Sequence, residues 1–204
     1  MYSGMEKRHV AVFDFDGTLT QRDTLPLFIR FAKGTGAYYA GLAVCSPFLL
    51  AYVLRLYPND KAKQRLFSHF FKGMDYTTFR QLGIDFAQHI DSIACQHAVQ
   101  RLKEHLLQGK VYVVSASVTE WVEPWCRAQG VCQVLGTQVE VSADGRLTGC
   151  FLSRNCYGEE KVRRLLEAEP HRADYYLTAY GDSRGDCEML AFADTGINVR
   201  NSKL

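Results

Sequence analysis

The chain has 204 residues, of which 47% are hydrophobic and 23% are charged. This composition is typical of one globular core with at most a small insertion, and it excludes a disordered or fibrous protein. The 24 basic and 22 acidic residues give a net charge of +2. Because the basic residues are spread along the chain, we do not expect nucleic acid to be a partner.

The cysteines indicate the redox environment that we expect for the chain. They number seven, and no two of them form a C-x-x-C pair. The first eight residues lack the apolar stretch of a secretory signal. We therefore expect reduced, buried thiols in a cytoplasmic protein rather than a disulfide or metal framework.

The first part of the chain predicts one strand followed by a long helical block. A short apolar run at residues 9–13 indicates a buried strand. After it the pattern is helical up to about residue 89, and Asp23 or Thr24 can serve as the first N-cap. Pro, Asn and Asp at residues 58–60 interrupt this block. The helices predicted after this break span residues 61–71 and 76–89.

An uncharged apolar run covers residues 37–54, and its length alone makes it a candidate membrane span. Pro47 lies in the middle of the run, small residues dilute it, and Lys33 and Arg55 flank it. We therefore expect a buried or interfacial pair of helices that is broken near Ser46 and Pro47. A contact with a membrane surface through residues 37–54 stays open.

The rest of the chain alternates between helices and strands. The predicted helices cover residues 96–107, 119–129, 159–168 and 186–193. The predicted strands cover residues 110–114, 134–135, 175–180 and 196–199, with a hairpin formed by residues 138–141 and 147–152. This order predicts an α/β fold, a Rossmann-like parallel sheet with an all-helical cap inserted after the first strand. We expect residues 1–20 and 95–204 to form the catalytic core and residues 21–94 the helical cap.

Polar residues of unusual type follow three of the predicted strands, and a lysine opens the helix before the last of them. These residues are Asp14, Asp16 and Gly17 after the first strand, Ser115 and Ala116 after the second, Lys161, and Asp182 and Asp186 after the late strand. Ligands bind beyond the carboxyl ends of the strands in an open parallel sheet. We therefore expect four carboxylates, a hydroxyl and an ammonium to converge on one edge of the sheet.

Such a cluster suits metal-assisted phosphoryl transfer. Clustered carboxylates repel one another, so a cation must lie among them. Mg²⁺ fits because it prefers few carboxylates together with water and phosphate oxygens, and Asp14 and Asp182 can supply the charges. Asp14 can attack phosphorus and form an aspartyl-phosphate. Asp16 can protonate the leaving group and then accept a proton from water.

The remaining polar residues support these two carboxylates. Lys161, Ser115 and the backbone N–H groups of a helix that starts after Ser115 would hold the phosphoryl oxygens. Asp186 would be an outer metal ligand or would orient Lys161. Together these roles predict a phosphomonoester hydrolase.

In order and spacing these motifs resemble the four signatures of the haloacid dehalogenase-like hydrolase superfamily over the whole chain. The D-x-D-G-T motif at residues 14–18 is highly specific, and the G-D-S-x-x-D motif at residues 181–186 is moderately so. The resemblance implies that Asp14 is the nucleophile and Asp16 the acid/base. It implies metal binding by Asp14, Asp182 and the backbone carbonyl of Asp16. The phosphate-binding residues that we expect are Thr18, Ser115, Ala116 and Lys161.

The position of the helical insertion resembles the phosphoserine-phosphatase-like subfamily IB. Residues 115–117 and 181–186 depart from the Ser-Gly-Gly and Gly-Asp-Gly-x-Asn-Asp patterns of phosphoserine phosphatases. Asp23 and Arg65 are similar in position to a glutamate and an arginine that bind the substrate in that group. We therefore expect a small phosphomonoester, phosphoserine or a relative, as the substrate.

Two alternatives stay open. The apolar run also resembles that of bacterial phosphatidylglycerophosphatases, so the chain could be a lipid-phosphate hydrolase that docks at a membrane surface. The other alternative is a non-enzymatic phosphoacceptor or binding domain, which Asp16 disfavours because a built-in acid/base would shorten the life of a phosphoryl group. The sequence does not predict the oligomeric state.

Overall fold

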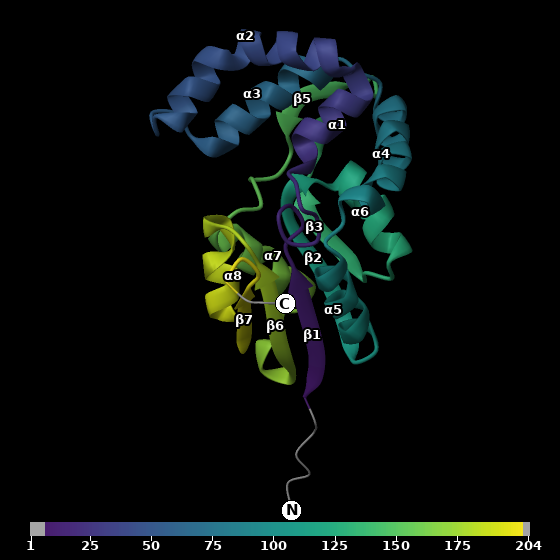
Figure 1. The fold of residues 1–204 in the computed structure, drawn as a ribbon, viewed down its shortest axis with the longest axis vertical. Helices are drawn as coiled ribbons and strands as arrows, with labels where there is room; N and C mark the ends of the chain where they lie inside the picture. The colour runs from purple at the N-terminus through teal and green to yellow at the C-terminus, as the bar shows by residue number, and fades with distance from the viewer. Residues whose placement is uncertain (1–6, 202–204) are drawn as a thin grey trace, which may run out of the picture.

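The computed structural model describes residues 7–201 and is built around a five-stranded parallel sheet in the order β3-β2-β1-β6-β7 (Figure 1). The strands are β1 (Arg8–Phe13), β2 (Gly109–Val118), β3 (Gln133–Thr137), β6 (Tyr175–Gly181) and β7 (Thr195–Asn198). β1 pairs with β2 on one side and β6 on the other, so the carboxyl ends of the three strands lie together. The predicted parallel α/β fold is confirmed.

Helices cover both faces of the sheet. Successive residues of β1 point to opposite faces, and both sets are apolar, so each face needs a covering layer. Ala11 and Phe13 pack into one hydrophobic cluster, and Val10 and Val12 pack into another. The helices around the sheet are α5 (Gln96–Leu106), α6 (Thr119–Ala128), α7 (Glu159–Ala168) and α8 (Cys187–Phe192). The two-sided burial explains why β1 has a continuous apolar run rather than alternating polar residues.

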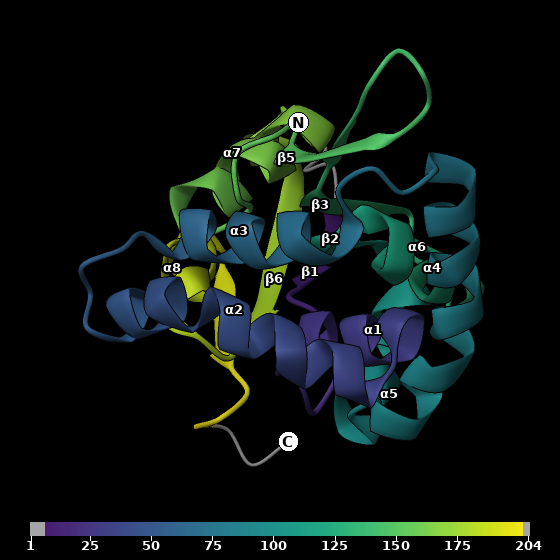
Figure 2. The same ribbon diagram turned by 90° about the horizontal axis from the view of Figure 1, so that it is seen from above.

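Four helices lie over the carboxyl end of the sheet, and we call them the helical block (Figures 1 and 2). They are α1 (Thr24–Lys33), α2 (Thr35–Val53), α3 (Asn59–Phe71) and α4 (Tyr76–Ile90). Phe28 of α1 lies at the centre of an aromatic cluster and stacks on Trp121 of α6, with ring centroids 4.5 Å apart. Because both rings are fully buried, this contact ties the block to the sheet.

A hairpin of the core holds the other side of the block. It consists of β4 (Val139–Val141) and β5 (Leu147–Phe151), and Phe151 packs on Phe67 of α3 with ring centroids 5.1 Å apart. The Gly73 N–H donates to the Leu147 carbonyl at 2.7 Å, and the Leu147 N–H donates to the Met74 carbonyl at 2.9 Å. The predicted hairpin is confirmed, and it fastens the end of α3 by backbone hydrogen bonds.

The prediction of a helix break near Pro47 is wrong, because α2 continues through this residue. Proline has no N–H and therefore leaves the carbonyl four residues earlier, that of Ala43, without its helical partner. The Ser46 hydroxyl donates to this carbonyl at 2.7 Å and replaces the missing hydrogen bond.

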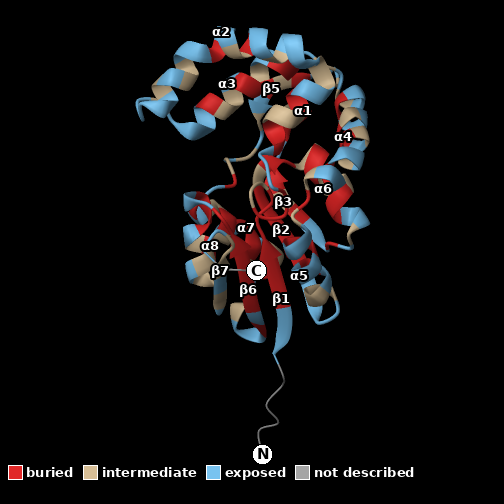
Figure 3. Cartoon of the chain, in the orientation of Figure 1, coloured by how far each residue is buried: buried red, intermediate tan, exposed pale blue. Residues whose placement is uncertain are grey.

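Of the two placements expected for this apolar run, buried or interfacial, burial is wrong. Only Gly41 and Cys45 of α2 are buried, whereas Val44 and Val53 are 64% and 71% exposed (Figure 3). In residues 7–201, α2 is the one helix long and apolar enough to cross a membrane by length and composition.

The thiols are free, as predicted, but they are not all buried. Cys45, Cys126 and Cys156 are buried and Cys95 is partly buried. Cys132, Cys150 and Cys187 are exposed, so the prediction of burial is wrong for these three. Cysteine spacing carries no information on which face of an element a thiol occupies.

Gly17 allows the loop after β1 to pack against the loop after β6. Its φ is +82°, and a Cβ at this position would lie 2.5 Å from an oxygen of the Asp182 carboxylate. Both the backbone conformation and the close contact therefore require glycine.

We expect Gly17→Ala to reduce the free energy of unfolding more than Gly145→Ala. Gly145 has a φ of +79° with no atom within 4 Å of its added Cβ, so it isolates the backbone cost of about 1–2 kcal/mol. Gly17→Ala should lose about 1–3 kcal/mol more, because Asp182 must move. Chemical denaturation measures both values, and equal losses would show that the contact with Asp182 imposes no constraint.

Candidate active site

A cavity of about 360 Å³ lies at the carboxyl end of the sheet, beneath the helical block. Five of the residues predicted from the strand ends line it, namely Asp14, Asp16, Ser115, Ala116 and Lys161. The helical block contributes Asp23, Leu25, Pro26, Leu49, Tyr52, Asn59, Ala62, Lys63 and Leu66. The cavity therefore combines polar groups from the sheet with a largely apolar roof.

Asp14 and Asp186 share one ammonium. Lys161, in the first turn of α7, donates from Nζ to Asp14 Oδ1 and to Asp186 Oδ1, each at 2.5 Å. All three side chains are buried. A buried charge is costly unless it is paired, so this arrangement compensates one negative charge and leaves a second in excess.

The pKa shifts of the three groups agree with one ammonium that two carboxylates share. Burial alone would lower the pKa of Lys161, but Asp14 and Asp186 outweigh it and raise the pKa. Burial alone would raise the pKa of Asp186, but Lys161 and Ser183 hold it below its usual value. Burial raises the pKa of Asp14 to about 7 although Lys161 lowers it, and the neighbouring Asp186 adds to the increase. Asp14 and Asp186 together therefore carry one more negative charge than Lys161 can compensate.

The surroundings of Asp16 differ from those of Asp14. The backbone N–H of Thr24 donates to Asp16 Oδ1 at 2.8 Å, and the Ser117 hydroxyl donates to Oδ2. Burial raises the pKa of Asp16, the negative charge of Asp23 adds to this, and the two hydrogen bonds oppose it. A carboxyl group that keeps its proton to a higher pH is suited to donate that proton.

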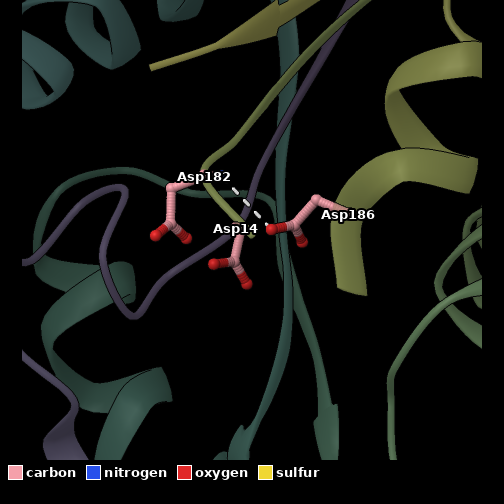
Figure 4. A group of neighbouring side chains, drawn as sticks. All are labelled: Asp14, Asp182 and Asp186. Carbon is pink, nitrogen blue, oxygen red and sulfur yellow. Dashed lines mark hydrogen bonds between the residues drawn. The ribbon is translucent and has the colours of Figure 1, made fainter. Parts of the chain in front are cut away.

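The carboxylates of Asp14, Asp182 and Asp186 gather at one point (Figure 4). One oxygen of each lies within 4.8 Å of the others. Asp186 Oδ2 accepts from the Ser183 N–H at 2.9 Å and from the Ser183 hydroxyl at 2.7 Å, and its other oxygen binds Lys161. Asp186 therefore contacts both Lys161 and the loop after β6.

Asp182 retains an oxygen that could bind a metal ion. Its Oδ2 pairs with Arg200 Nη2 at 2.5 Å, whereas the buried Oδ1 has no hydrogen-bond partner among residues 7–201. No motif or spacing in the sequence indicated Arg200 as a site residue. An unpartnered buried carboxylate oxygen beside Asp14, which shares its one cation with Asp186, fits the oxygen ligands that Mg²⁺ prefers.

Three of the four predicted phosphate-binding residues, Thr18, Ser115 and Lys161, are buried, but no helix start follows directly after Ser115. β2 continues to Val118, with an irregular register between Val114 and Val118, and α6 begins at Thr119, as predicted, so the backbone N–H groups directly after Ser115 belong to the strand. The Ser115 hydroxyl accepts from the Ser117 N–H at 3.0 Å. Thr18 Oγ1 is buried without a partner in the described part of the chain, although Thr18 does not line the cavity.

Ser117 is a residue that the sequence analysis missed. The predicted strand ended at Val114, whereas in the structure Ser115 and Ser117 both belong to β2. Residues two apart in a strand face the same side, and this periodicity could have identified Ser117.

The two predicted specificity residues lie in different places. Asp23 lines the cavity, and its Oδ1 also caps α1 by accepting from the Leu25 N–H at 2.9 Å. Arg65 does not line the cavity, because its guanidinium lies over the ring of Phe48, 4.7 Å from the centroid. Lys63, which the sequence analysis did not select, reaches the cavity from the same helix.

Comparison with known proteins gives the family. The chain is 35% identical over 188 residues to Protein CicA of Caulobacter vibrioides, covering 91% of this chain and 83% of that protein. A protein of unknown function from Bordetella pertussis has a similar structure, with a TM-score of 0.75 at 20% identity, covering 91% of this chain and 87% of that one. A substrate-bound phosphoserine phosphatase has the same fold, with a TM-score of 0.62 at 20% identity, covering 92% of this chain and 84% of that one. The model of the haloacid dehalogenase-like hydrolase family matches residues 11–191, and the chain therefore belongs to this family.

Proposed function

We propose that this chain is a Mg²⁺-dependent phosphomonoester hydrolase in which Asp14 is the nucleophile and Asp16 the acid/base. The observation that carries the proposal is the pair of carboxylates in one cavity with different surroundings. Asp14 shares the Lys161 ammonium with Asp186, whereas Asp16 is held by two uncharged hydrogen-bond donors. Paired carboxylates in different environments suit the separate roles of nucleophile and proton donor.

The chemistry assigned to these groups has two steps. An oxygen of Asp14 attacks phosphorus, the bond to the leaving oxygen breaks, and Asp16 transfers its proton to that oxygen. Asp16 then accepts a proton from water as the water oxygen attacks the aspartyl-phosphate, which releases phosphate and restores Asp14. Lys161 and Ser115 would hold the phosphoryl oxygens.

The metal would be held by Asp14, Asp182 and the backbone carbonyl of Asp16. When bound, Mg²⁺ supplies positive charge that offsets the carboxylates and the phosphoryl oxygens. Two observations support its presence, the unpartnered oxygen of Asp182 and the raised pKa of Asp14, for which burial is the largest cause.

A small phosphorylated metabolite, phosphoserine or a relative, is the substrate that we propose. A cavity of about 360 Å³ suits a small molecule, and Asp23 offers an acidic group in it. Residues 21–94 would act as the cap that excludes bulk water during the reaction. The position of Asp16 beside Asp14 disfavours the non-enzymatic phosphoacceptor.

A lipid-phosphate substrate is a second candidate, and the exposure of α2 favours it. Val44 and Val53 of this uncharged helix face solvent, and Leu49 and Tyr52 of the same helix line the cavity. A membrane surface in contact with α2 would therefore lie near the site.

Asp14→Asn should reduce phosphate release to background, because the amide cannot attack phosphorus. Asp16→Asn should slow turnover by about 10²–10⁴, the usual contribution of general acid–base catalysis. Asp144→Asn is the matched control, since Asp144 is exposed in the hairpin and should leave the rate unchanged. The assay is phosphate release from p-nitrophenyl phosphate with Mg²⁺ and with EDTA. Near-normal turnover of the Asp14 variant would remove it as the nucleophile.

Mg²⁺ should bind about tenfold more weakly at pH 6 than at pH 8. Burial raises the pKa of Asp14 to about 7, so the carboxyl group is mostly protonated at pH 6 and must lose its proton to bind a cation. The ratio follows from proton competition at a pKa of about 7. Isothermal titration calorimetry measures the dissociation constants, and Asp14→Asn should abolish most of the pH dependence. A wild-type affinity that stays constant between these pH values would contradict the role of Asp14 as a ligand.

The lipid candidate predicts that the wild-type protein co-sediments with anionic liposomes and that Val53→Asp weakens this binding at least severalfold. A charge on an exposed apolar position opposes burial in the membrane interface. Val141→Asp is a control at an exposed apolar residue of the hairpin. Absence of binding by the wild-type protein would exclude docking through α2.

A further inference from the structure

Lys63 of α3 is a cation of the cavity for which the catalytic scheme has no use. Its Nζ donates to the backbone carbonyl of Ala116, next to the predicted phosphate-binding residue Ser115. The side chain is partly buried, and in the described part of the chain it forms no ion pair with a carboxylate.

The local helical geometry explains why this lysine, and not Arg65, reaches the site. Lys63 and Leu66 are three residues apart in α3 and lie on the same face of the helix, and both line the cavity. Arg65 is two residues from Lys63 and therefore lies on a different face, over Phe48.

Lys63 retains donor capacity for a ligand. An ammonium has three N–H donors, and one is used by the Ala116 carbonyl. Lys161, the other cation that lines the cavity, is already shared by Asp14 and Asp186. Of the two lysines that line the cavity, Lys63 is therefore the one whose positive charge is available to an anionic group of a ligand.

The position of Lys63 relative to the carboxylates indicates which part of a substrate it would meet. Burial lowers the pKa of Lys63, and this is opposed most strongly by Asp16, then by Asp23, and less by Asp14. Lys63 belongs to the helical block, which lies over the carboxyl end of the sheet, whereas Asp14 belongs to the loop after β1 (Figure 1). Lys63 thus reaches the cavity from the side of the block, and Asp14 from the side of the sheet. In an in-line displacement the leaving group departs opposite the attacking oxygen, on the side of the proton donor.

We propose that Lys63 is a specificity-determining residue that binds a singly charged anionic group, such as a carboxylate, on the leaving group of the substrate. One ammonium balances one negative charge, whereas a second phosphate would require a further cation that the cavity lining does not offer. This inference rests on the proposed phosphatase function and narrows its substrate to phosphomonoesters with an acidic leaving group.

The test compares two substrates that differ in one group, 3-phosphoglycerate with a carboxylate and glycerol 3-phosphate with a hydroxymethyl in its place. The wild-type enzyme should have the higher kcat/KM for 3-phosphoglycerate. In Lys63→Met the ratio of the two kcat/KM values should fall about 10–100-fold, the usual effect of losing a hydrogen bond to a charged group. Lys63→Arg should retain part of the preference.

Lys61→Met is the matched control, because Lys61 is an exposed lysine of the same helix that does not line the cavity. It should leave the ratio within about twofold of the wild-type value, since it removes a charge without removing a contact. Circular dichroism and thermal unfolding check that each variant is folded, and Lys63→Gln replaces Lys63→Met if the latter does not fold.

The outcomes separate this inference from the proposed function. If the wild-type protein releases no phosphate from any phosphomonoester with Mg²⁺, the phosphatase proposal itself fails. If it hydrolyses p-nitrophenyl phosphate but does not prefer 3-phosphoglycerate, the role of Lys63 is overturned. An equal loss on both substrates in Lys63→Met would also overturn it, because Lys63 would then act on the phosphoryl group.

Discussion

The site depends on one buried ammonium that two carboxylates share. Lys161 donates to Asp14 and to Asp186, and Asp186 in turn holds the loop after β6 through Ser183. Asp14 lies at the same ammonium but keeps a pKa of about 7, mainly because it is buried. A site with fully balanced charges would be more stable but would have little affinity for a cation or for a phosphoryl group. The missing positive charge is therefore what makes this cluster a candidate for binding and catalysis.

The sheet brings these groups together because β1 lies between β2 and β6. The loops that follow these strands end at one edge, where Gly17 packs directly against Asp182. The helical block lies above this edge and is held to the core by the stacked rings of Phe28 and Trp121 and by the β4–β5 hairpin. Side chains that are far apart in the sequence, such as Asp14 and Asp182, are thus brought together by the pairing of neighbouring strands.

The sequence predicted the parts of the structure that local patterns determine. An apolar run followed directly by Asp14 and Asp16 is a local pattern that predicts a strand ending in reactive residues. The structure places both residues in one cavity. The helix break at Pro47 was wrong because a single hydroxyl, that of Ser46, replaces the lost hydrogen bond. Neither this compensation nor the rotation of α3, which places Lys63 rather than Arg65 at the cavity, follows from helical periodicity. Both depend on contacts that form only in the folded chain.

The helical block and the sheet contribute different functions, but Asp16 connects them. In the proposed mechanism the sheet supplies the reactive groups, whereas Lys63 of the block and Asp23, the N-cap of α1, would contact a leaving group. The Thr24 N–H at the start of α1 donates to Asp16. Burial is the main cause of the raised pKa of Asp16, and the negative charge of the neighbouring Asp23 raises it further. Movement of α1 away from the sheet would therefore remove a hydrogen bond from Asp16 and expose it to water. The proton donor would then be correctly oriented only when the residues that recognise the substrate are in place, which couples recognition to proton transfer through one helix terminus.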